Sequence, residues 1–208
     1  MNIAGKELQS LTGIEQFKYL QSIDVSNNKL IHLQNLSALK HLIKLNASHN
    51  HLKRMFDFEP PANLEWVDYS NNNIARIENA HLHVYLRYLK LDENNVNVIE
   101  GLQENRNLRV LSLNSNTIDI IENLDGLLLD ELYLADNNLK SIGGLQALPN
   151  LRTLDLTKNG ISKLGGFEIV ESLRFLYLCQ NNISKVRELN AISELPLITE
   201  LDLSFNPV

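Results

Sequence analysis

The stretch Leu151-Arg-Thr-Leu-Asp-Leu-Thr-Lys-Asn-Gly-Ile161 contains a pattern that returns throughout this chain. Leucine stands at positions 1, 4 and 6 of this eleven-residue frame, asparagine at position 9 and isoleucine at position 11. The 208-residue chain has nine such frames, which start at Leu20, Leu42, Leu64, Leu86, Leu108, Leu129, Leu151, Leu173 and Ile198. The steps between the starts are 22, 22, 22, 22, 21, 22, 22 and 25 residues. A fixed period of this length predicts a solenoid.

Residues around positions 3 to 5 of each frame alternate, as in Thr153-Leu154-Asp155, and this alternation predicts a short strand. Leu154 then points into the core, whereas Thr153 and Asp155 point outward onto the concave face of the coil. Neighbouring strands are expected to pair in parallel. The predicted fold is an α/β solenoid with a parallel sheet on its concave face and 3₁₀ and irregular turns on its convex face.

Position 9 is asparagine in all nine frames. The series is Asn28, Asn50, Asn72, Asn94, Asn116, Asn137, Asn159, Asn181 and Asn206. After each strand the chain must turn and leave peptide groups inside the coil, and a buried amide can both donate to and accept from them. We therefore predict a structural ladder of asparagines with no catalytic role.

The second half of each repeat has apolar residues every third position, which suits short 3₁₀ turns. The 25-residue step adds three residues, and the series Ile183, Val186, Leu189, Ile192, Leu195 and Ile198 stays in phase across it. One extra 3₁₀ turn that keeps this series in the core is the expected result.

Several repeats are irregular. Pro60 and Pro61 forbid regular helix in the back of the second repeat and predict a stiff, extended connection. In the third and fourth repeats, polar or small residues replace apolar ones at Ala80, His83 and Asn105. The convex-side segments of these repeats are therefore expected to be more loosely packed and more solvated.

We expect one elongated domain over residues 1–208. Residues 1–19 read as a partial N-terminal repeat that has Lys6 where the asparagine would stand. The ninth frame ends at Val208 with no residues to cover its apolar flank, so a C-terminal cap is expected to be missing.

Composition narrows the function. The net charge of −6 argues against binding to a phosphate backbone, and no apolar run is long enough for a membrane span. The one cysteine, Cys179, favours a reducing, cytoplasmic setting. We expect neither nucleic acid nor membrane as a partner.

The outward positions 3, 5, 7 and 8 are rich in acid. They carry nine carboxylates: Asp24, Asp68, Asp92, Glu93, Glu131, Asp136, Asp155, Glu200 and Asp202. Three cations, Lys44, Lys90 and Lys158, stand among them. An acidic face steers a basic partner surface toward it, although a merely solvated sheet face is the alternative.

Aromatic residues share this face. Trp66, Tyr88 and Val110 occupy position 3 of adjacent repeats and are expected to stack side by side. Large aromatics on a rigid face are typical interface anchors, unless they only pack on one another or under a terminal extension. The predicted partner-binding residues are Trp66, Asp68, Tyr88, Lys90, Asp92, Val110, Glu131, Tyr133, Asp155, Phe175, Tyr177 and Cys179.

Metal and catalytic sites have weaker support. His49 with His51, and His81 with His83, lack further ligands in frame, so no metal and no cofactor are expected. Cys179 has no evident histidine base, and the carboxylates lie on an open sheet. We do not expect an enzyme.

The frame, with its 22-residue period, resembles the SDS22-like class of leucine-rich repeats. Three places are similar to the repeat region of the leucine-rich repeat and guanylate kinase domain-containing proteins. They are Asp24–Leu30, then Leu45–Asn50 with Phe58–Leu64 (which contains Pro60-Pro61) and Val67–Tyr69, and finally Glu188–Val208. That resemblance implies a role in cilium or sperm-flagellum assembly. The chain has no G-x-x-x-x-G-K phosphate loop, so any nucleotide chemistry would belong to a segment outside it.

The sequence therefore favours a scaffold that binds another protein, one with a basic patch, through its concave face. The alternatives are an SDS22-like regulatory subunit of a protein phosphatase and an accessory region of a guanylate-kinase-like enzyme. A monomer or a weak end-to-end dimer is expected, because an open edge strand invites pairing.

Overall fold

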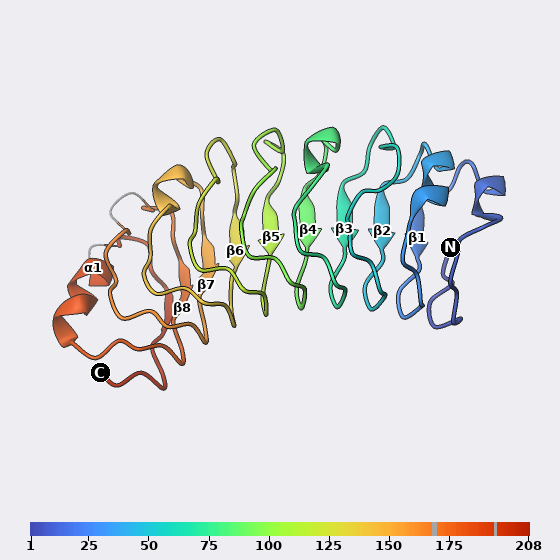
Figure 1. Ribbon diagram of the computed structural model, residues 1–208. Coiled ribbons are helices and arrows are strands. Elements are labelled where there is room, and N and C mark those ends of the chain that lie inside the picture. Colours follow the sequence, from blue (N-terminus) through green and yellow to red (C-terminus); the bar gives the residue numbers. More distant parts are fainter. Residues whose placement is uncertain (168–169, 194) are drawn as a thin grey trace.

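The computed structural model describes residues 1–167, 170–193 and 195–208. The chain winds into one elongated solenoid, with the two termini at its opposite ends (Figure 1). Each repeat forms one coil that stacks on the coil before it, because a single repeat cannot bury its own apolar residues.

One sheet of nine parallel strands runs the length of the molecule, in the order of the sequence. The strands are β1 (Ser22–Asp24), β2 (Lys44–Asn46), β3 (Trp66–Asp68), β4 (Tyr88–Lys90), β5 (Val110–Ser112), β6 (Glu131–Tyr133), β7 (Thr153–Asp155), β8 (Phe175–Tyr177) and β9 (Glu200–Asp202). Each strand covers positions 3 to 5 of one frame, and equivalent positions pair across the sheet, as Trp66 does with Tyr88. The predicted solenoid with a parallel sheet is confirmed.

Short turns form the side opposite the sheet. They include the 3₁₀ turns η1 (Ile14–Gln16), η2 (Gln34–Ala38), η3 (Ala80–Leu82), η4 (Leu145–Ala147) and η5 (Val186–Leu189), and the single-turn helix α1 (Asn190–Ser193). The three-residue insertion therefore adds more than the expected 3₁₀ turn, because η5 continues directly into α1.

The core runs between the sheet and these turns. Position 4 of each inner frame is buried, as at Leu111, which is 0% exposed. On the outermost coil the equivalent Leu201 is 40% exposed, since no coil lies on its outer side. The prediction that Val186 belongs to the core series is wrong: its side chain is 73% exposed, and Ile192 and Leu195 take up the packing beyond it.

The nine asparagines at position 9 all bond the turns of two successive coils. In the middle of the solenoid, Asn116 Nδ2 donates to the carbonyls of Leu91, Leu113 and Asn114 at 2.9–3.1 Å. The Oδ1 atom of Asn116 accepts from the backbone N–H of Val96 at 2.9 Å. One side chain thereby satisfies four backbone groups, two of them on the preceding coil, and ties the coils together.

Position 8 adopts a left-handed backbone conformation in all nine frames. The residues are Asn27, His49, Asn71, Glu93, Ser115, Asp136, Lys158, Gln180 and Phe205, with φ between 52° and 56°. This conformation turns the chain sharply out of the strand and is unfavourable for bulky side chains. The fold therefore imposes one strained residue per repeat, most costly at Phe205.

The prediction of loose, solvated backs in the third and fourth repeats is wrong. Ala80 and Asn105 are 0% exposed and His83 is 3% exposed. The imidazole of His83 stacks on Phe56 with ring centroids 4.0 Å apart, and Asn105 Nδ2 donates to the carbonyls of Ala80 and His83 at 2.9 and 3.0 Å. Aromatic packing and an amide bridge fill the space that leucines would otherwise occupy.

Candidate partner-binding face

The outward side of the sheet, formed by positions 3, 5, 7 and 8 of the frames, is called the concave face below. Strands β3 to β8 carry ten of the twelve predicted partner-binding residues, and Asp92 and Cys179 follow β4 and β8 at position 7. All twelve are partly buried. The parallel register puts them in straight rows, so distant parts of the sequence form one surface.

Two aromatic rings on β3 and β4 stack on one another, and a lysine on β2 lies over the first of them. The rings of Trp66 and Tyr88 are stacked, with centroids 5.1 Å apart and planes 9° from parallel. Lys44 places its Nζ atom 4.2 Å from the centroid of the Trp66 ring, and this cation–π contact adds to the stack. Val110 pairs with Tyr88 in the next strand and continues the row.

The three lysines of the concave face are all engaged within the molecule. Lys44 lies over Trp66, Lys90 pairs with Asp92 at 3.3 Å and Lys158 pairs with Asp136 at 2.9 Å. Two of them are thus paired with carboxylates of the same face. Burial lowers the pKa of Lys90, but the carboxylates of Asp92 and Asp68 outweigh it, so its pKa is raised overall and the side chain stays charged.

Seven carboxylates of the same face have no cationic partner among the described residues. They are Asp24, Asp68, Glu93, Glu131, Asp155, Glu200 and Asp202. The unpaired carboxylates therefore far outnumber Lys44, the one lysine of this face that has no carboxylate partner among the described residues, and the face is acidic.

Some of these carboxylates also have a structural task. Asp68 Oδ1 accepts from the backbone N–H of Ser70 at 2.8 Å, and Asp155 Oδ1 accepts from the N–H of Thr157 at 2.9 Å. Such Asx turns hold the chain as it leaves the strand. The predicted binding residues Asp68 and Asp155 thus stabilise the turns that follow their strands, and they also contribute negative charge to the concave face.

A hollow of about 220 Å³ opens over β5, and it is called the β5 hollow below. It is lined by Tyr88, Lys90, Asp92, Val110, Ser112, Asn114, Glu131 and Tyr133. The β5 strand presents the small residues Val110 and Ser112, whereas β4 and β6 present large side chains on either side. Six of the eight lining residues belong to the predicted set.

Sequence reasoning missed Ser112 and Asn114 in this hollow. The hydroxyl of Ser112 donates to Asp92 Oδ1 at 2.5 Å, and the backbone N–H of Asn114 donates to the same oxygen at 2.9 Å. A small residue at position 5 between two large ones was the available signal. These bonds fix Asp92, which in turn holds Lys90.

The opposite wall of the β5 hollow is a tyrosine–glutamate pair. The Tyr133 hydroxyl donates to Glu131 Oε2 at 2.7 Å. Burial and the hydrogen bond to Glu131 raise the pKa of Tyr133 well above its usual value, so this hydroxyl remains a donor. Burial likewise raises the pKa of Tyr88. The other oxygen of Glu131 has no partner among the described residues.

Phe175, Tyr177 and Cys179 lie apart from the β5 hollow. Phe175 and Tyr177 stand on β8, where their register partners are Thr153 and Asp155 on β7. Cys179 Sγ accepts a hydrogen bond from the hydroxyl of Ser204 at 3.2 Å. The predicted set therefore divides into a compact group over β3 to β6, Asp155 on β7 beside it, and a second group on and after β8.

A larger groove of about 550 Å³ lies on the turn side of the second repeat, lined in part by Arg54, Asp57 and Glu59. Arg54 pairs with Glu78 at 2.6 Å, His32 with Asp57 at 3.1 Å and Lys40 with Glu59 at 2.6 Å. Because these side chains are paired with one another or with neighbours, this groove offers a partner fewer unpaired charges than the concave face does.

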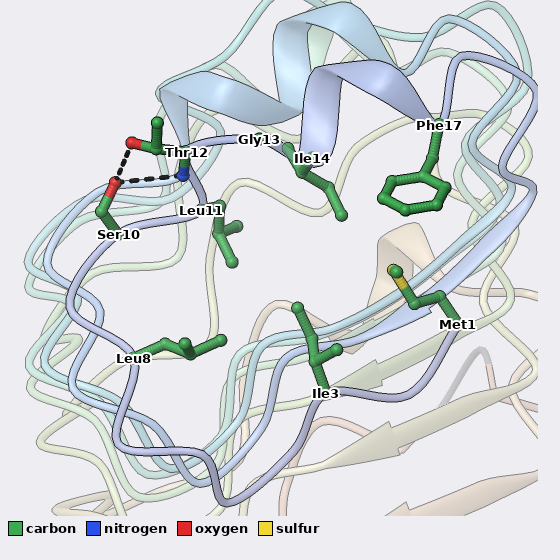
Figure 2. A pocket seen from close by; sticks show the side chains of 9 residues that line it. All are labelled: Met1, Ile3, Leu8, Ser10, Leu11, Thr12, Gly13, Ile14 and Phe17. Atoms are coloured by element: carbon green, nitrogen blue, oxygen red, sulfur yellow. Dashed lines mark hydrogen bonds between the residues drawn. The ribbon is translucent and has the colours of Figure 1, made fainter.

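Both ends of the solenoid are open and apolar. Figure 2 shows the N-terminal end, where Met1, Ile3, Leu8, Leu11, Ile14 and Phe17 surround a hollow of about 310 Å³. The C-terminal end has a hollow of about 320 Å³ lined by Leu189, Ile192, Ser193, Leu195, Ile198, Leu201 and Leu203. Each lies on the outer flank of a terminal coil, where no other described coil packs.

Among the described residues, no group of three or more histidine, cysteine, aspartate or glutamate side chains is placed to hold a metal ion. His83 is buried against Phe56 and lies away from solvent. No helix among the described residues has the length and apolar character to cross a bilayer.

Family comparisons agree with this geometry. A family model described as leucine-rich repeats (2 copies) matches residues 128–168, and two models described as leucine-rich repeat match residues 149–208 and 104–119. The chain is a leucine-rich repeat protein. Such domains generally mediate protein–protein interaction. Among curated proteins, none matches the chain.

Solved structures resemble this leucine-rich repeat protein closely in shape. Internalin C2 from Listeria monocytogenes has a TM-score of 0.79 at 25% identity, over 85% of this chain and 79% of its own. A leucine-rich repeat protein of Leptospira interrogans has a TM-score of 0.74 at 26% identity, over 99% of this chain and 60% of its own. TLR13, in a complex with ssRNA13, has a TM-score of 0.76 at 28% identity, over 88% of this chain. This chain spans only 29% of that TLR13 chain.

Proposed function

We propose that this leucine-rich repeat protein is a non-catalytic scaffold. Its acidic concave face binds a basic patch on the surface of a partner protein. One observation carries the proposal: the rigid stack of Lys44, Trp66 and Tyr88 lies on a face whose other two lysines are paired with carboxylates and whose remaining carboxylates are unpaired. Preordered aromatics supply contact area at low entropic cost, and the uncompensated acid selects a cationic partner.

The carboxylates of the concave face also indicate which class of molecule the partner belongs to. A nucleic acid would bring phosphates against Asp68, Glu131 and Asp155, so the proposal favours a protein over the kind of ligand named for TLR13. We propose a cytoplasmic location from the single cysteine, and a role in cilium or flagellum assembly from the resemblance noted in the repeats. Regulation of a protein phosphatase in the manner of SDS22-like proteins is the alternative.

Affinity capture from a cell extract tests the proposal when it is done with matched baits. The wild-type chain is compared with the double variant Trp66→Ala/Tyr88→Ala on the concave face and with Arg54→Ala on the turn side. We expect at least one protein with a basic surface to be retained by the wild type and by Arg54→Ala but lost from the double variant. Its affinity, measured with the purified partner, should fall as salt is raised.

Two outcomes would overturn the proposal. Retention of every captured protein by the double variant would place binding on another face or on the ends of the solenoid. Loss of capture with Arg54→Ala alone would place it in the groove of the second repeat. Circular dichroism of each bait must first show that it is folded.

A further inference from the structure

We propose that the β5 hollow is a receptor for one arginine side chain of the partner. This inference rests on the proposed function and gives the chemistry of one contact within it. Its starting point is shape: Val110 and Ser112 leave a hollow of about 220 Å³ between the larger side chains of β4 and β6. A hollow in an otherwise filled sheet face is where a protruding side chain of a partner is received.

The first wall of the hollow suits a flat cation. Trp66 covers the β3 side of the Tyr88 ring, and Tyr88 lines the hollow from β4. The stack with Trp66 holds the ring in place before any partner arrives. A guanidinium group stacks on an aromatic face, whereas the compact, strongly hydrated ammonium of lysine does so less readily.

The second wall suits a cation with several donors. Glu131 receives one hydrogen bond from Tyr133 through Oε2, at 2.7 Å, and its other oxygen has no partner among the described residues. A purely apolar occupant would strip water from this carboxylate without replacing the hydrogen bonds. A guanidinium supplies charged donors in a planar fork that matches a carboxylate.

The charge of the hollow excludes an anion. The only cation that lines it is Lys90, and Asp92 already holds its Nζ atom at 3.3 Å while itself being fixed by Ser112. Glu131 therefore leaves the hollow with a net negative charge. Asp68 and Asp155, which have no cationic partner among the described residues, lie on flanking strands and add to it.

A blocked tripeptide with arginine at its centre, acetyl-Gly-Arg-Gly-amide, is the probe. It is titrated into ¹⁵N-labelled protein while amide chemical shifts are recorded, with the matched citrulline and lysine peptides as controls. Citrulline keeps the planar shape of arginine but has no charge. We expect saturable shifts centred on Val110 and Ser112 with a dissociation constant of about 1 mM, no saturable shift with citrulline and weaker binding with lysine.

Glu131→Gln should weaken the arginine peptide at least about fivefold, which is a loss of about 1 kcal/mol. Glu200→Gln is the control, because Glu200 also stands at position 3 but on β9, far from the hollow. Tyr88→Leu, which keeps apolar bulk but removes the ring, should also weaken binding. The inference is overturned if the arginine peptide gives no saturable shift, shifts another region, or binds Glu131→Gln and wild type equally.

The two proposals fail in different ways. If Glu131→Gln loses no affinity for the arginine peptide while Trp66→Ala/Tyr88→Ala still abolishes partner capture, the arginine receptor is wrong and the concave scaffold stands. If the partner is retained by that double variant, the scaffold proposal fails, whatever the peptide does.

Discussion

The indole of Trp66 and the phenol ring of Tyr88 lie face to face, with centroids 5.1 Å apart and planes only 9° from parallel. They are 22 residues apart in the chain, and parallel pairing of β3 with β4 puts them directly opposite one another. A Trp–Tyr pair held by backbone register loses little entropy on binding, which makes it the natural anchor of the concave face.

Trp66→Ala and Tyr88→Ala should each weaken partner binding by about 1–3 kcal/mol while leaving the fold intact, because each removes an aromatic anchor from the sheet surface. Isothermal titration calorimetry with the captured partner is the measurement. Tyr85→Ala is a matched control, since Tyr85 is 53% exposed and lies outside the strands. Unchanged affinity in both anchor variants would contradict the prediction.

Asn116→Leu should lower the free energy of unfolding by about 1–3 kcal/mol, because leucine leaves buried carbonyls and a buried N–H unsatisfied. Those groups belong to Leu91, Leu113, Asn114 and Val96. Urea denaturation provides the number. The same change at the exposed Asn95 should cost far less, and equal losses at both positions would argue against the ladder.

Gly144→Ala should destabilise the chain by about 1–3 kcal/mol, whereas Gly143→Ala should not. Gly144 has a φ of 76°, and a Cβ atom there would lie 2.0 Å from the carbonyl oxygen of Ile121 on the preceding coil. At Gly143 a Cβ atom would meet nothing within 4 Å. Thermal melts of the two adjacent variants make the comparison, and a shared melting temperature would refute it.

Acid should destabilise the fold through His83. Burial, and to a smaller extent the charge of His81, lower the pKa of His83 from 6.5 to about 4. Within the described residues neither ring nitrogen has a hydrogen-bond partner. Because the unfolded chain binds the proton more readily, the free energy of unfolding is highest above pH 6.5 and declines as pH falls toward 4, by up to about 3 kcal/mol.

Urea denaturation of wild type and His83→Phe, at several pH values across that window, tests the assignment. The variant keeps an aromatic ring against Phe56 and should lose much of the pH dependence. His49→Gln, at an exposed histidine, should keep it. A wild-type slope retained in His83→Phe would show that other groups cause the acid sensitivity.

Backbone amides of residues 196–208 should exchange with solvent faster than those of residues 108–113. Among the described strands, β9 has a neighbour only on its β8 side, and Leu201 is 40% exposed where Leu111 is fully buried. Hydrogen exchange of a dilute monomer is the direct test. Equal protection in the two segments would mean that stacking on one side is sufficient for this coil.

The sequence by itself determined the features that repeat. The alternation at positions 3 to 5 and the asparagine at position 9 are visible within each frame, and the spacing between frames gives the 22-residue period. They predict the solenoid, its strands and the row that contains Trp66 and Tyr88, because identical units stacked in register must place equivalent residues side by side.

The tertiary structure decided what happens where repeats differ. Only packing between unlike neighbours makes a hollow over Val110 and Ser112, buries His83 beneath Phe56 and leaves Val186 in solvent. Only the shared backbone path forces Phe205 into the same left-handed conformation as Asn27. Such outcomes depend on the side-chain volumes and hydrogen bonds that adjacent coils contribute. The periodic pattern describes only what the repeats share, so it does not specify these differences.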